Sequence, residues 1–149
     1  MKSFICFATL VFVSFAQADL SGVAGDWRGW GQWTFQGSGT DCFPMDISFK
    51  ETDGQLSRVK GFFECSVVAL HSDPLVWEKS GDKLLMDGKE VGTLKPGLVE
   101  MSEPYDDEVT VKTTMNIEGN HMDYMEIWTF NDGRPLYEIT GRLFRRTGK

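Results

Sequence analysis

The sequence predicts an all-β protein, a single antiparallel up-and-down β-barrel of about eight to ten strands. Short segments alternate apolar and polar residues, and no stretch has the apolar spacing of an amphipathic helix. Turn signals that contain glycine separate these segments, and connections this short join antiparallel neighbours without a crossover helix. The turn signals are Asp53-Gly54, Ser80-Gly81, Asp87-Gly88, Gly119-Asn120 and Asp132-Gly133.

The N-terminal residues have the pattern of a secretory signal. Lys2 supplies a positive start, residues 4–15 are almost wholly apolar, and Ala16-Gln17-Ala18 matches an A-x-A cleavage site. The apolar run is shorter than the roughly 20 residues that span a bilayer, and no later stretch approaches that length, so we expect no membrane span. We therefore expect 1–18 to be a signal peptide and 19–149 to form one barrel domain, in a periplasmic or secreted protein.

The chain is acidic and carries two cysteines beyond the expected signal. It has 15 Lys and Arg residues against 22 Asp and Glu residues, a formal net charge of −7. This charge repels phosphate backbones, so we expect no nucleic-acid partner. In an oxidising compartment Cys42 and Cys65 would normally form a structural disulfide. The alternative is a reactive or metal-binding pair, but the close C-x-x-C spacing typical of those roles is absent.

The expected strands form a meander in which consecutive segments are neighbours. They span residues 27–36, 43–51, 56–68, 74–79, 82–87, 89–95, 98–103, 109–118, 121–131 and 134–146. The mostly acidic stretch 103–108 is expected to be a solvated loop. A one-sided meander must bury its apolar face against itself, and closure into a barrel does this while removing exposed edges. The alternative is a two-sheet sandwich, a fold that favours Greek-key connections not visible here.

Alternation along the strands assigns side chains to the interior or to the surface. If Gly119-Asn120 is a two-residue turn, Glu118 pairs with His121, and the apolar and polar sets of the last three strands separate onto opposite faces. In 56–68, a three-residue loop at Asp53-Gly54 keeps Arg58 and Lys60 in water, which avoids the cost of burying them. The expected inward residues of the first three strands are Trp27, Gly29, Gly31, Trp33, Phe35, Phe43, Met45, Ile47, Phe49, Val59, Gly61, Phe63, Cys65 and Val67.

The segment Gly25-Asp26-Trp27 resembles the G-x-W signature that opens lipocalins and related calycin barrels. The resemblance implies that Trp27 plugs the closed end of the barrel and that an arginine of the last strand lies across it. Arg142 and Arg145 are the candidates, and we assign this role to Arg142. The acidic T-D-x-x-N-Y loop signature of the family is absent. Residues 27–31 also look like the opening of haem-binding nitrobindins, which ligate iron through a late histidine; none follows His121, so we expect no cofactor.

The predicted interior suits one small molecule, because barrels of about eight strands are either filled by side chains or hold a small ligand. Alternation places Glu126 inward, where a carboxylate is costly without a partner. It could bind a polar group of a ligand, lie in water at an open mouth, or bond to a tyrosine hydroxyl. Inward glycines either leave volume for the ligand or allow the strands to coil. The residues expected to contact a ligand are Trp33, Phe35, Phe63, Met115, Tyr124, Glu126, Trp128 and Tyr137.

These observations favour a non-enzymatic exported protein that holds a small hydrophobic or amphipathic molecule inside the barrel. The alternative is a binding module or inhibitor of another exported protein, which would use loops and the outward aromatics Trp30, Phe62 and Phe144. A third hypothesis is an isomerase or cyclase with Glu126 as general base. No catalytic-triad motif is present. The stretch 121–125 contains possible soft-metal donors, but His121, Asp123 and Met125 face outward on a strand while Met122 faces inward. We therefore expect no metal site.

Overall fold

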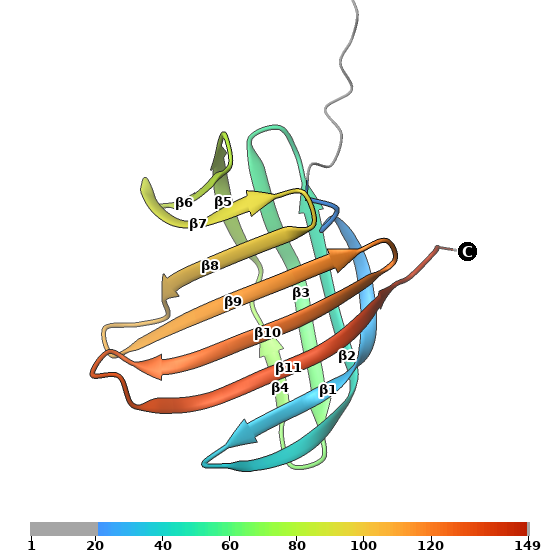
Figure 1. Cartoon of the computed structure of the whole chain (residues 1–149), viewed down its shortest axis with the longest axis vertical. Coiled ribbons are helices and arrows are strands. Elements are labelled where there is room, and N and C mark those ends of the chain that lie inside the picture. Colours follow the sequence, from blue (N-terminus) through green and yellow to red (C-terminus); the bar gives the residue numbers. More distant parts are fainter. Residues whose placement is uncertain (1–20, 149) are drawn as a thin grey trace, which may run out of the picture.

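The computed structural model describes residues 21–148, and this part of the chain forms a closed antiparallel β-barrel without helices (Figure 1). Each strand pairs with its neighbours along the chain, β11 returns to β1, and β2 pairs with β3 to close the ring. The predicted all-β up-and-down barrel is therefore confirmed. The strands are β1 (Gly25–Phe35), β2 (Ser38–Glu51), β3 (Gln55–Cys65), β4 (Ala69–Ser72), β5 (Leu75–Ser80), β6 (Lys83–Met86), β7 (Lys89–Lys95), β8 (Leu98–Pro104), β9 (Val109–Glu118), β10 (His121–Phe130) and β11 (Pro135–Arg145).

The expected signal peptide, residues 1–18, lies outside the described residues. Within 21–148 there is no helix of the length and apolarity needed to cross a bilayer.

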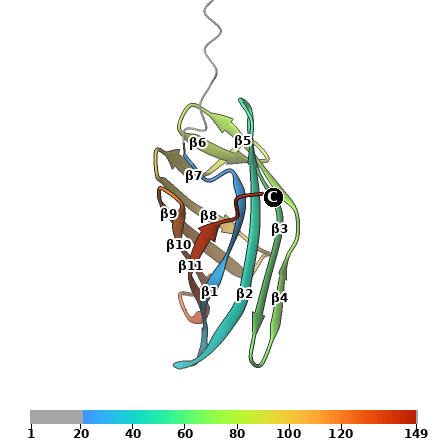
Figure 2. The same cartoon turned by 90° about the vertical axis from the view of Figure 1, so that its right-hand side faces the viewer.

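Strands β4 and β5 share one position in the barrel, so the eleven strands make a ten-stranded ring. The first half of β3 pairs with β5 and its second half pairs with β4. Residues Asp73-Pro74 separate the two strands, because proline has no N–H with which to continue the hydrogen-bond ladder. Strand β4 was not predicted, because four residues are too few to show an alternating pattern. Figure 2 shows β2–β4 on one side of the barrel and β8–β11 on the other.

The last three strands have the predicted register. Glu118 pairs with His121, and Trp128 pairs with Tyr137. Side chains then alternate between core and surface along β9 and the first half of β10, as a sheet with one buried face requires. The hairpin turns at Gly119 and Gly133 have positive φ, which explains why glycine occupies them. Two consecutive hairpins therefore fix the interior face of this wall.

Two β-bulges change the predicted facing of the first strands. In β2 the register slips at Phe43-Pro44, so Cys42 and Met45 both point inward while Phe43 is exposed. Cys42 then lies opposite Cys65, and the two form the expected disulfide. The inward assignment of Phe43 was wrong because a bulge shifts alternation by one residue.

The second bulge lies in β3, where Val59 is the extra residue. Ser48 pairs with Lys60 and the next residue, Phe49, pairs with Arg58, so Val59 is left out of the ladder and is 38% exposed. Leu56 and Arg58 consequently point into the barrel. The predictions of an inward Val59 and an outward Arg58 were therefore wrong. Val67, also predicted inward, is exposed because β3 ends at Cys65.

The inward glycines of β1 and β11 serve packing rather than cavity volume. A side chain at Gly31 would collide with the backbone of β11 and with the Met45 sulfur. A side chain at Gly141 would meet the end of the same Met45 side chain. Met45 is completely buried and fills the space above both glycines. Close approach of two backbones is a common reason for glycine in a strand.

The Trp27 indole is buried in the core, and the arginine that lies across it is Arg145 rather than the predicted Arg142. Trp27 is 1% exposed and its Nε1 donates to the Val23 carbonyl at 2.8 Å. The Arg145 guanidinium lies 4.3 Å from the indole centroid and donates to the Gly22 and Ala24 carbonyls. Arg142 instead points outward, because it is one residue out of phase with the inward positions of β11.

Candidate ligand-binding site

The barrel contains a cavity of about 680 Å³. This volume is within the range of sites for small molecules, roughly 300–1,000 Å³. The exposed residues at its edge come from β4 and the β4–β5 connection on one side and from the end of β8 on the other, so the mouth lies between these segments. Most of the wall is apolar, formed by Phe63, Leu70, Leu75, Met86, Val109, Val111, Trp128, Leu136, Tyr137 and Ile139.

Glu126 is a buried carboxylate in the wall of this cavity. Its side chain comes from β10 and the residue is 3% exposed. One carboxylate oxygen accepts a hydrogen bond from the Tyr124 hydroxyl, and the other accepts from Trp128 Nε1 at 2.9 Å. Burial and the neighbouring Glu126 raise the pKa of the Tyr124 hydroxyl well above its usual value. Neutral donors therefore satisfy this carboxylate.

Glu103 is a second buried carboxylate in the same wall. It is 8% exposed and accepts a hydrogen bond from Trp77 Nε1 at 2.8 Å. Burial raises the pKa of Glu103 above its usual value, and Glu126 adds to this effect, whereas the Trp77 hydrogen bond and Arg58 oppose it. The expectation that Glu103 belongs to a solvated loop was wrong. It continues the inward alternation of Val99 and Met101 along β8.

Arg58 brings a positive charge to the cavity. Its Nε and one terminal nitrogen both donate to the Asp73 carbonyl at 3.1 Å, and its guanidinium carbon lies 6.0 Å from the Trp77 ring centroid. The contact with Asp73 ties β3 to the connection between β4 and β5. Arg58 reaches the interior only because of the bulge at Val59, a feature that alternation in the sequence does not reveal.

Aromatic rings surround Trp128 near the mouth. Tyr105 meets the Trp128 ring edge-on at a centroid distance of 4.8 Å, and Tyr137 stacks on it at 4.9 Å. Burial and the nearby Glu126 raise the pKa of the Tyr137 hydroxyl. Trp128 also donates its indole N–H to Glu126, so the aromatic rings and the carboxylate are adjacent in the cavity wall.

Four of the eight predicted ligand-binding residues line the cavity, and the other four do not. The cavity wall includes Phe63, Glu126, Trp128 and Tyr137.

The other four lie away from the cavity wall. Tyr124 and Met115 are fully buried in the core. Trp33 packs against Tyr137 at 6.1 Å, and its Nε1 is the one buried side-chain polar atom without a hydrogen-bond partner within the described range. Phe35 stacks on Trp33 at the end of β1 and is partly exposed, because its strand runs past the barrel rim.

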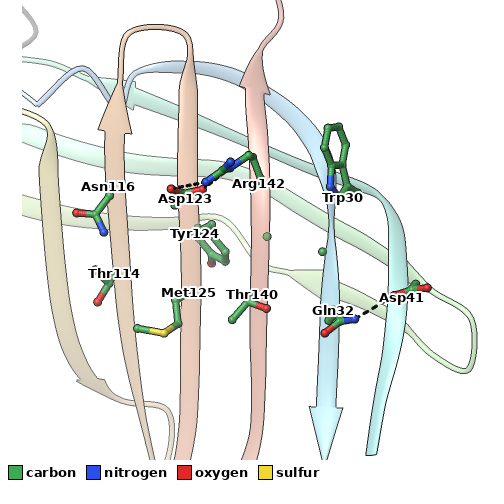
Figure 3. A pocket seen from close by; sticks show the side chains of 12 residues that line it. Trp30, Gln32, Asp41, Thr114, Asn116, Asp123, Tyr124, Met125, Thr140 and Arg142 are labelled. Carbon is green, nitrogen blue, oxygen red and sulfur yellow. Dashed lines mark hydrogen bonds and ion pairs between the residues drawn. The ribbon is translucent and has the colours of Figure 1, made fainter.

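A second hollow, of about 570 Å³, lies on the outer surface, mainly over β1, β9, β10 and β11 (Figure 3). Trp30 lies at one side of it and Asn116 at the other. Its central charges pair with each other, since Arg142 Nε donates to Asp123 at 2.7 Å and holds the pKa of that carboxyl below its usual range. This hollow is open to water, whereas the interior cavity carries buried carboxylates. The interior is therefore the stronger candidate site.

The aromatic residues suggested for binding another exported protein lie on the surface, but they form two separate groups. Trp30 is 54% exposed and packs against Phe144 at a centroid distance of 5.4 Å. Phe62 is half-buried and packs against His71 at 4.9 Å. Binding of another protein through these residues stays a prediction.

The sequence matches no protein-family model and no curated protein. Among solved structures, the S-type phycobiliprotein lyase CPES from Guillardia theta superposes with a TM-score of 0.62 at 11% identity, over 85% of this chain and 89% of the lyase chain. The fold is a lipocalin-like barrel. This lipocalin-like barrel also superposes, with a TM-score of 0.60 and 14% identity, on a DUF3598-family protein of unknown function from Nostoc punctiforme.

The second superposition covers 83% of this chain and 48% of the other, so this chain spans about half the length of the Nostoc protein. At such identities the likeness shows the fold alone.

Glu103 should make the stability of the barrel depend on pH. Because burial raises its pKa in the folded state, the folded protein binds this proton more tightly than the unfolded chain does. The cost of its charge is therefore absent in acid, below the pKa of the unfolded chain, and fully present once the pH exceeds the raised pKa. Glu103→Gln should raise the melting temperature at neutral pH and change it little in acid, as thermal melts over this range would show.

The matched control is Glu100→Gln, an exposed outward glutamate on the same strand. It should follow the wild-type pH dependence. An equal gain in stability for Glu103→Gln at all pH values would contradict the prediction.

Proposed function

We propose that this protein binds a small amphipathic molecule inside the barrel and does not transform it. The observation that carries the proposal is the interior cavity of about 680 Å³, which combines an apolar wall with a few polar groups. Binding sites for small molecules have this composition, in which apolar contacts supply affinity and a few polar groups fix orientation. The lipocalin-like barrel supports the proposal, since its interior is not completely filled by side chains.

We also propose that it works outside the cytoplasm, as a periplasmic or secreted protein. The signal-like pattern of 1–18 supports this location, and the Cys42–Cys65 disulfide is compatible with it.

The binding proposal can be tested with Nile red, a neutral dye that fluoresces strongly in apolar surroundings. Wild-type protein should enhance its emission in a saturable way. Leu75→Trp should reduce the affinity about tenfold or more, because Leu75 is a partly buried wall residue and a larger side chain there fills the cavity. The measurement is a fluorescence titration at neutral pH.

Val76→Trp is the matched control, because it adds the same side chain at the next residue, which faces outward. It should bind the dye like the wild type. Absence of saturable emission with the wild type, or equal loss in both variants, would contradict an internal site.

A further inference from the structure

The cavity wall contains two buried acidic side chains that form no ion pair in the described part of the chain. Glu103 and Glu126 are both more than nine-tenths buried, and neither belongs to any ion pair found within residues 21–148. Their hydrogen-bond donors in this part of the chain are uncharged: the indole N–H groups of Trp77 and Trp128 and the hydroxyl of Tyr124. Burying a carboxylate without a cation is costly, so this arrangement leaves the interior ready for a positive charge.

Arg58 does not supply the missing ion pair. Two of its nitrogens are directed to the Asp73 carbonyl, an uncharged acceptor, and its plane lies near the Trp77 ring. Its charge acts on Glu103 from a distance and lowers the pKa of that carboxyl less than burial raises it. The wall therefore holds two buried acidic side chains and one arginine, and the arginine forms an ion pair with neither of them.

The aromatic residues next to these carboxylates are suited to the same kind of ligand. Faces of tryptophan and tyrosine rings attract cations, most strongly where water is excluded. Trp128 lies between Tyr105 and Tyr137 and is hydrogen-bonded to Glu126, which brings ring faces and a carboxylate together at one point of the wall. The apolar remainder of the cavity can contact an uncharged body.

We propose that the molecule held in the barrel is an organic cation, with an apolar body and a protonated amine that contacts Glu103, Glu126 and the Trp128 ring. This inference rests on the proposed function and adds the chemical class of the ligand. It predicts that a fatty acid or another apolar anion binds poorly, because its carboxylate would face two others.

The test uses calorimetric titration of the purified protein at neutral pH with three compounds that share one ring system: naphthylethylamine, naphthylethanol and naphthylacetate. The affinity for the amine should exceed that for the alcohol by about tenfold or more, and the affinity for the acid should be the lowest. Glu103→Gln and Glu126→Gln keep the size of each side chain and a hydrogen-bond acceptor. Each should lower the ratio of amine affinity to alcohol affinity about fivefold or more.

Arg58→Gln separates a cation site from an anion site. It removes the arginine charge from the wall, so it should raise the ratio of amine affinity to alcohol affinity. Equal binding of alcohol and amine, or tightest binding of the acid together with its loss in Arg58→Gln, would overturn the cationic ligand while leaving an internal binding site intact. No binding of any compound, together with no uptake of Nile red, would instead reject the proposed function itself.

Discussion

Replacing Trp27 with alanine is expected to lower the free energy of unfolding by about 3–5 kcal/mol, the usual cost of removing a buried tryptophan. The indole is almost fully buried, donates to the Val23 carbonyl, and carries the Arg145 guanidinium on its face. Its removal leaves a cavity at the closed end and an arginine without its aromatic contact. The change is measured by urea denaturation, with circular dichroism as the signal for unfolding.

Trp30→Ala is the matched control. It removes the same side chain from the outward face of the same strand, where more than half of it is exposed. We expect a loss of about 1 kcal/mol or less, since surface substitutions usually change stability little. Equal destabilisation by the two substitutions would contradict the assignment of Trp27 as the plug of the core.

Removal of the Cys42–Cys65 disulfide is expected to cost about 3 kcal/mol. The bridge joins residues 23 positions apart, and closing a loop of this size restricts the unfolded chain by roughly that amount in the chain-entropy treatment. The double substitution Cys42→Ala with Cys65→Ala should therefore unfold at lower urea than the oxidised wild type. Both sites are buried, so small apolar replacements fit them.

A reductant provides the control for this second prediction. Wild-type protein with its disulfide reduced should fall to nearly the stability of the double variant, and the double variant should not respond to the reductant. If reduction leaves the wild-type midpoint unchanged, the bridge does not contribute to stability.

The fold was predictable from the sequence because its information is local. Turn signals such as Gly119-Asn120 fix a hairpin, and two consecutive hairpins with compatible faces define a wall of the barrel. The G-x-W segment drew attention to Trp27, whose indole is buried in the core. The partner arginine was misassigned although alternation favoured Arg145, since Leu143 and Arg145 share the inward phase of β11 while Arg142 does not.

The candidate site was only half predictable, for a physical reason. Glu126 was found because β10 is regular up to that point and its register follows from the preceding turn. Glu103 could have been found from the inward phase of β8, but neighbouring acidic residues suggested a loop. Arg58 could not be found, because the bulge that turns it inward comes from pairing between strands rather than from any residue pattern.

The bulge at Val59 makes strand pairing, as well as residue identity, a determinant of which side chains a bound molecule contacts. If Val59 instead took a place in the ladder, it would pair with Phe49 and face the interior, and Arg58 would turn to solvent. A backbone irregularity that carries no side chain of its own into the cavity thus decides whether an arginine lines it.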